Sequence, residues 1–154
     1  MTRDTSLTAA WSGRIDASDG IMGRRWHQVV RPAAAADRAG VALVGFACDA
    51  GVVRNSGRPG AAAGPVALRR ALANLAWHGG DDARLYDAGD VSCRGDDLEA
   101  AQSSYAERLA ALLRAGHFPI GLGGGHEIAF GAYLGLEQSF GNDPRLERLG
   151  IVNF

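Results

Sequence analysis

The strongest chemical signal in the sequence is a histidine that directly follows three glycines, in the run Gly123-Gly-Gly-His126-Glu127. A neutral imidazole is a common ligand of divalent first-row metals, and glycines let the backbone turn sharply and other groups approach the ring. His126 is therefore a candidate metal ligand, with Glu127 beside it as a supporting or substrate-facing group. The alternative is that His126 is a structural or helix-capping residue, and the run itself leaves both interpretations open.

The same segment contains part of the Gly-x-Gly-x-x-Gly fingerprint of dinucleotide-binding proteins. His126 stands where the third glycine is needed, and no Asp or Glu follows at a strand end about twenty residues later. A dinucleotide site is therefore not expected. No other histidine has the spacing that would complete a metal site with His126.

A second signal is the loop Arg54-Asn-Ser-Gly-Arg-Pro-Gly60, which follows an apolar segment of strand length. A guanidinium group presents a planar fork of donors that fits a carboxylate bidentately. Asn55 and Arg58 are therefore candidate binding residues for an acidic small molecule. The alternative is that these arginines are solvated or paired with nearby acids.

The elements that must position these residues alternate between strand and helix patterns along the chain. Such alternation predicts a mostly parallel sheet with helices on both faces, and sheets of this kind carry their chemistry at the carboxyl ends of the strands. Expected strands cover residues 41–47, 84–91 and 118–122. One expected helix begins at Gly64-Pro65 and ends at Gly79-Gly80, a second covers about 97–115 with an N-cap at Asp96-Asp97, and a third includes 128–136.

Apolar spacing also predicts which faces are buried. Leu68, Leu72 and Leu75 lie at helical spacing and predict the buried face of the helix that begins at Gly64. The run 118–122 predicts a buried strand. Gly131 and Gly135 are four residues apart and would let another element approach the last helix closely.

The two ends of the chain differ from its middle. Residues 1–40 have no sustained period and predict an irregular N-terminal arm, so that the α/β domain covers residues 41–154. The run 149–154 predicts the start of another buried strand. We therefore expect the domain to be truncated within a central strand.

Composition excludes several classes of function. The chain has 154 residues and a net charge of −1, so it has no basic excess for nucleic acid. All 16 cationic side chains are arginine, which excludes chemistry that depends on lysine. No segment approaches the roughly 20 apolar residues of a membrane helix. Cys48 and Cys93 are too few for a disulfide framework, so we expect reduced thiols and a cytoplasmic protein.

The run Gly123-Gly-Gly-His-Glu-Ile-Ala-Phe-Gly131 resembles the first metal-ligand motif of the arginase/agmatinase ureohydrolase family, in the form of its formimidoylglutamase members. The resemblance extends from about Trp11 to the last residue, with its motifs in the same order. The other matching segments are Trp11-Ser-Gly-Arg-Ile-Asp16, Arg25-Trp-His-Gln-Val29, Gly45-Phe-Ala-Cys-Asp49, Arg54-Asn-Ser-Gly-Arg-Pro-Gly-Ala61, Gly64-Pro65 and Asp87-Ala-Gly-Asp90.

This resemblance implies a three-layer α/β/α fold with a mostly parallel sheet, a pair of Mn²⁺ ions, and hydrolysis of N-formimidoyl-L-glutamate to L-glutamate and formamide in histidine degradation. His126 takes the place of the first metal-ligand histidine. The family's other ligands lie in Asp-Ala-His-x-Asp and Asp-x-Asp motifs, which are expected beyond Phe154. The 154-residue chain is accordingly expected to be an inactive N-terminal part of such an enzyme.

The implied partner is the small-molecule substrate, with no nucleic acid and no membrane, and the formation of a homo-oligomer is left open. Two alternatives remain at this stage. One is agmatinase or another amidine hydrolase, which is distinguished from a formimidoylglutamase by whether the substrate has an acidic tail. The other is a non-catalytic remnant that binds a ligand or a partner.

Overall fold

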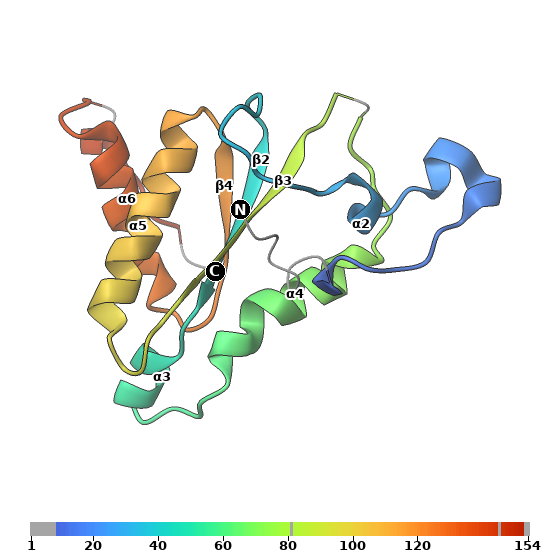
Figure 1. Ribbon diagram of the computed structural model, residues 1–154. Helices are drawn as coiled ribbons and strands as arrows, with labels where there is room; N and C mark the ends of the chain where they lie inside the picture. The colour runs from blue at the N-terminus through green and yellow to red at the C-terminus, as the bar shows by residue number, and fades with distance from the viewer. Residues whose placement is uncertain (1–8, 81, 145, 153–154) are drawn as a thin grey trace.

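Four strands form one parallel sheet in the order β1-β3-β2-β4 (Figure 1). The computed structural model describes residues 9–80, 82–144 and 146–152. The strands are β1 (Arg31–Pro32), β2 (Val41–Ala47), β3 (Leu85–Ser92) and β4 (Phe118–Leu122). The helices are α2 (Trp26–Val29), α3 (Ala50–Arg54), α4 (Gly64–Ala73), α5 (Leu98–Arg114) and α6 (Ile128–Phe140), with 3-10 helices at Ala17–Gly23, Ala61–Ala63 and Leu146–Arg148.

Helices cover both faces of the sheet, with α5 and α6 on one side and α2 and α4 on the other (Figure 1). Successive residues of β2 point to opposite faces, so Ala42, Val44 and Phe46 join the core beneath α5 while Leu43 joins a second core with Trp26 and its neighbours. A strand that is buried on both faces has a continuous run of apolar residues in its sequence, as β2 does. The three-layer α/β/α architecture with a parallel sheet is confirmed.

A bulge in β3 lets two aspartates reach the same side of the sheet. Asp87 pairs in register with Leu43 and Asp90 with Gly45, so one residue of β2 lies opposite two of β3. Without the extra residue, positions three apart on a strand would point to opposite faces. Gly89 within the bulge has φ of 80°.

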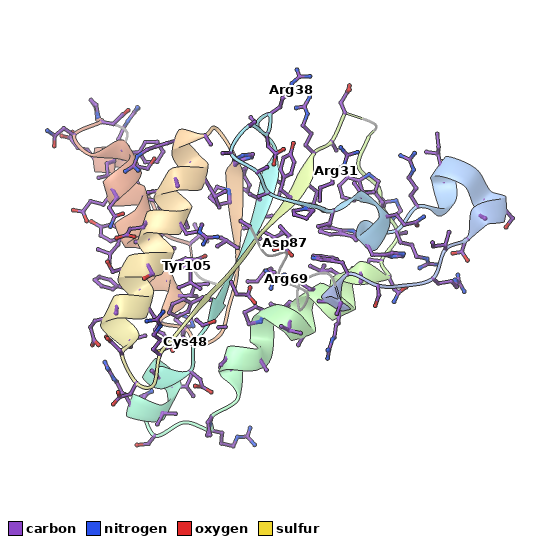
Figure 2. All side chains as sticks on the ribbon, viewed as in Figure 1. Arg31, Arg38, Cys48, Arg69, Asp87 and Tyr105 are labelled. Carbon is purple, nitrogen blue, oxygen red and sulfur yellow. The ribbon has the colours of Figure 1, made fainter. Side chains whose placement is uncertain are left out.

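Both aspartates contact Arg69 of α4, which is fully buried. Figure 2 shows Arg69 beside Asp87. The guanidinium binds Asp87 through Nε at 2.7 Å and Nη2 at 2.9 Å, and its Nη1 lies 2.6 Å from Asp90 Oδ1. Trp11 Nε1 donates to the same Asp87 carboxylate at 2.6 Å. Burial acts to lower the pKa of Arg69, but the bonds and charge of Asp87 and the charge of Asp90 outweigh it and raise that pKa.

This ion pair explains why the predicted buried face of α4 is wrong. The buried face consists of Pro65, Arg69 and Ala73, whereas Leu68 and Leu75 remain 43% and 52% exposed. The paired arginine orients the helix, and apolar spacing gives no sign of a buried cation. The helix also ends at Ala73 instead of continuing to the glycines at 79 and 80.

The prediction for α5 is confirmed, because it begins after Asp97, whose carboxylate accepts the Ala100 N–H at 3.1 Å. Gly131 and Gly135 of α6 do allow close approach, and the approaching element is α5. A Cβ at Gly135 would lie 2.9 Å from the Ala106 carbonyl oxygen.

Two further expectations for the apolar runs are wrong. β4 is not buried, because only β2 pairs with it in the described chain and Phe118 and Ile120 are 68% and 39% exposed. Residues 149–152 form no strand, and Ile151 and Val152 are 81% and 75% exposed. Residues 153–154 of that predicted strand lie outside the described residues.

Before residue 41, the described chain contains only short elements, and β1 joins the sheet by pairing Arg31 with Tyr86. The division into an arm of residues 1–40 and a domain of residues 41–154 stays a prediction. Among the described residues, every helix is too short or too polar to cross a bilayer.

Candidate functional site

The candidate site lies where β2 and β4 end, because the turn after β4 rests on the last residues of β2. Gly124 N–H donates to the Phe46 carbonyl at 2.9 Å, and Gly125 N–H donates to the Cys48 carbonyl at 3.0 Å. The glycine-histidine turn and the loop after β2 therefore occupy the same edge of the sheet, as the alternation of strands and helices predicts.

The need for glycine in this turn differs from one position to the next. A Cβ at Gly124 would lie 2.2 Å from the Cys48 carbonyl oxygen and 2.5 Å from that of Phe46, so a side chain cannot fit. The nearest atom to a Cβ at Gly123 would be 3.8 Å away. Close contact with the backbone of β2 thus explains Gly124 in particular.

His126 is exposed in the turn that precedes α6. The helix has no side-chain cap, so the capping alternative for His126 does not apply, and its exposure excludes a role in the core. Within the described residues, no group of three or more His, Cys, Asp or Glu side chains is placed to hold a metal ion. The imidazole is therefore accessible, but in this part of the chain it does not belong to a group of three or more potential ligands.

Glu127 connects the two loops of the site. Its Oε1 accepts the Gly51 N–H at 3.0 Å, which ties the turn after β4 to α3. Its backbone carbonyl accepts Gln102 Nε2 at 2.9 Å, which ties the same turn to α5. Sequence reasoning missed both contacts, because the partners are 76 and 25 residues away and no local pattern joins them.

In the loop after β2, one arginine is paired with an acidic side chain, whereas Asn55 and Arg58 point to solvent-exposed surface. Arg54 binds Glu99 of α5 at 2.5 and 3.0 Å, so the alternative of pairing with a nearby acid holds for this residue. Asn55 caps the end of α3 through its backbone N–H, and its side chain and that of Arg58 are exposed. Asp49 accepts the Gly60 N–H at 2.7 Å.

The contact with Arg54 changes the acidity of its partner. The Arg54 hydrogen bond lowers the pKa of Glu99 to about 2, with a backbone hydrogen bond acting in the same direction. The loop after β2 is therefore held at Arg54 by α5 and at Gly60 by Asp49, and Asn55 and Arg58 lie between Arg54 and Gly60. In the described chain no hydrogen bond joins Asn55 or Arg58 to His126.

The two cysteines follow β2 and β3 at this same edge and are free thiols, as predicted. Cys93 N–H donates to the Ala47 carbonyl at 3.2 Å, which continues the pairing of the two strands. Burial and the neighbouring Cys48 thiol raise the pKa of Cys93 to about 11. A raised thiol pKa disfavours the thiolate, so this geometry does not make Cys93 a nucleophile at neutral pH.

Comparison with known proteins agrees with this arrangement. The Arginase family model matches residues 39–154. Formimidoylglutamase from Aeromonas hydrophila is 53% identical over 148 residues, which cover 95% of this chain and 46% of that protein. Formimidoylglutamase from Chromobacterium violaceum is 51% identical over 144 residues, with 94% and 45% covered. The chain thus spans a little under half the length of these curated relatives.

Solved structures give the same result for the fold. A formiminoglutamase variant from Trypanosoma cruzi, solved with Mn²⁺, superposes with a TM-score of 0.61 at 27% identity, over 89% of this chain and 41% of that one. An arginase superfamily protein from the same organism gives a TM-score of 0.60 at 26% identity. The family match over three quarters of the sequence, the relatives and the shared fold confirm the resemblance, and the chain belongs to the arginase family.

Proposed function

We propose that this chain is part of an enzyme that hydrolyses N-formimidoyl-L-glutamate to L-glutamate and formamide. The observation that carries the proposal is its identity of about half of all positions with curated formimidoylglutamases over nearly the whole chain. The position of His126 at the carboxyl end of a central parallel strand supports it, since this edge is where such sheets carry their sites.

The described residues do not by themselves fit a pair of manganese ions. Mn²⁺ prefers oxygen-rich, near-octahedral coordination, and two ions that share ligands need several carboxylates. His126 offers one accessible imidazole, and no group of three or more potential ligands is present in the described chain. We propose His126 as one ligand of such a centre, with the others supplied by residues outside the described part.

We propose that Asn55 and Arg58 bind the glutamate portion of the substrate. Both side chains are exposed on a loop that leaves the same sheet edge as His126, and the loop is anchored on either side of them by Arg54 and Asp49. A substrate with two carboxylates is matched by a guanidinium group. Glu127 would orient this loop through Gly51, because the carboxylate is already committed to that N–H.

A chimera provides the test, in which this chain replaces the matching N-terminal part of the Aeromonas hydrophila formimidoylglutamase. The expected result is formamide release from N-formimidoyl-L-glutamate and no urea release from agmatine. Release of urea from agmatine instead would favour agmatinase. A folded chimera that consumes neither substrate would overturn the proposal and favour a non-catalytic binding role.

The same chimera tests the binding residues. Arg58→Ala should raise KM strongly, since losing a charge-assisted hydrogen bond costs about 1.5–3 kcal/mol, roughly a 10- to 150-fold change. Arg70→Ala is the control, because Arg70 is exposed on α4. An unchanged KM in a folded Arg58→Ala chimera would remove Arg58 from the site.

The free thiols of Cys48 and Cys93 are consistent with a reducing compartment, and we propose a cytoplasmic enzyme. Fractionation of cells that produce the chain from its own start codon would test this. Recovery with the periplasmic or membrane fraction would contradict it.

A further inference from the structure

A hollow of about 660 Å³ opens at the end of the sheet opposite to the candidate site. It lies at the start of β3 and beside β1, and Arg31 and Arg38 mark it in Figure 2 at the opposite end of the sheet from Cys48. From Val41 to Ala47, β2 spans about 20 Å at roughly 3.3 Å per residue. A ligand in the hollow would therefore not contact His126.

Among the described residues, the hollow is lined by more cationic than anionic side chains. These are the arginines Arg24, Arg31, Arg38 and Arg84, against the aspartates Asp37 and Asp82. The Asp37 carboxylate already accepts the Ala34 N–H at 2.6 Å. The lining thus has an excess of positive charge, although the chain as a whole has a net charge of −1.

Some arginines elsewhere in the described chain are paired with carboxylates. Arg25 binds Asp16, Arg54 binds Glu99 and Arg69 binds Asp87. Within the described residues, Arg31 and Arg38 have no such partner. Their guanidinium groups remain available for an anion.

The backbone that carries these arginines is held in place by specific contacts. Arg31 lies in β1, paired with Tyr86 of β3. The Arg38 carbonyl accepts the Tyr86 hydroxyl at 3.1 Å, and Arg84 Nη1 donates to the neighbouring Ala39 carbonyl at 3.1 Å. The three arginines are therefore presented from an ordered rim and not from an unsupported loop.

We propose that this hollow is a binding site for a small molecule with two or more phosphate or carboxylate groups, separate from the candidate catalytic site. The guanidinium fork matches both kinds of group bidentately. The presence of both Arg31 and Arg38 in the lining favours a ligand with at least two anionic groups over a single one. Trp77 and Tyr86 add apolar surface to the lining.

The test is calorimetric titration of the 154-residue chain with pyrophosphate, with citrate, and with acetate at equal ionic strength. The expected result is saturable binding of pyrophosphate or citrate at one site, and none of acetate. Pyrophosphate binding alone would assign the phosphate class, and citrate binding alone the carboxylate class. Quenching of tryptophan fluorescence offers a second readout, since Trp77 lines the hollow.

Variants locate the site. Arg31→Gln and Arg38→Gln should each weaken binding at least tenfold, and Arg70→Gln, which alters an exposed arginine of α4 outside the lining, should change it less than twofold. Circular dichroism checks that each variant folds. We expect all three to fold, because the three side chains that are replaced are exposed. The proposal would be overturned if neither pyrophosphate nor citrate bound. It would also be overturned if all three variants bound the anion equally well. Neither result depends on formimidoylglutamate hydrolysis.

Discussion

Two adjacent glycines, Gly123 and Gly124, have very different surroundings. A Cβ at Gly124 would lie 2.2 Å from a backbone oxygen of Cys48, which cannot move without disturbing β2, whereas the nearest atom at Gly123 would be 3.8 Å away. We expect Gly124→Ala to lower the free energy of unfolding by about 1–3 kcal/mol, the usual range for overpacking. Gly123→Ala should change it by less than about 0.5 kcal/mol.

Urea unfolding of the two variants beside the parent chain measures the difference. Equal stabilities for Gly123→Ala and Gly124→Ala would contradict the close packing of the turn on β2.

Arg69 and Arg70 offer a second matched pair on α4. Arg69 is fully buried against Asp87 and Asp90, and Arg70 is exposed. Removing one member of a buried ion pair leaves an uncompensated charge, so Arg69→Met should cost about 3–5 kcal/mol, while Arg70→Met should stay within about 0.5 kcal/mol.

Thermal or urea unfolding measures both effects. If Arg69→Met failed to fold, the double variant Arg69→Met/Asp87→Leu should recover part of the stability, because it also removes the more deeply buried of the two carboxylates that Arg69→Met leaves unpaired. A stable Arg69→Met single variant would contradict the role given to the pair.

The sequence indicates chemically distinctive residues better than it indicates their contacts. His126 was singled out from its three preceding glycines, and the structure places it at a sheet edge. The bond from Gly51 to Glu127 and the burial of Arg69 could not be predicted, because each depends on residues far away in the chain that meet only after folding.

At the scale of elements, one exposed ion pair joins α3 to α5. Arg54 lowers the pKa of Glu99 from 4.5 to about 2. A carboxylate with a lowered pKa in the folded state stabilises the fold above its unfolded pKa, and this contribution is lost as the pH falls towards the folded pKa. The contribution of Glu99 should therefore be complete above about pH 5 and should fade between about pH 4.5 and 2.

The variant Glu99→Gln tests this pH dependence. It should have a lower melting temperature than the parent at pH 7, and the difference should shrink as the pH approaches 2.5. Glu107→Gln, which alters another exposed glutamate of α5, is the control. A difference that stays constant over the whole pH range would contradict the ion pair.

Element boundaries with local signals were predictable, and burial was not. The carboxylate of Asp97 marks the start of α5, and a glycine with φ of 82° at position 116 follows its end. The orientation of α4 and the exposure of β4 depend instead on which elements lie beside them. The sequence of a strand shows that it is apolar, but it does not show whether another strand or helix covers it.

At the scale of the whole molecule, the sheet has β1 and β4 as its edges in the described chain. The candidate site and the arginine-lined hollow lie at opposite ends of the same strands. Because of this arrangement, binding of a ligand to one of the two sites can be measured while the other site stays empty. It also means that the metal and anion experiments report on independent sites.

The last prediction concerns metal binding by the 154-residue chain. The described residues provide an accessible histidine at the candidate site and no group of three or more ligands, so calorimetric titration with Mn²⁺ should detect no sub-micromolar site. His126→Ala should leave the titration nearly unchanged, because a single imidazole binds Mn²⁺ weakly and the ion favours oxygen ligands. The chimera with the Aeromonas hydrophila enzyme should bind Mn²⁺ tightly, and there His126→Ala should weaken it. Tight binding by the chain alone that His126→Ala abolishes would mean that this chain assembles a metal site by itself, and it would contradict the proposed need for ligands outside the described residues.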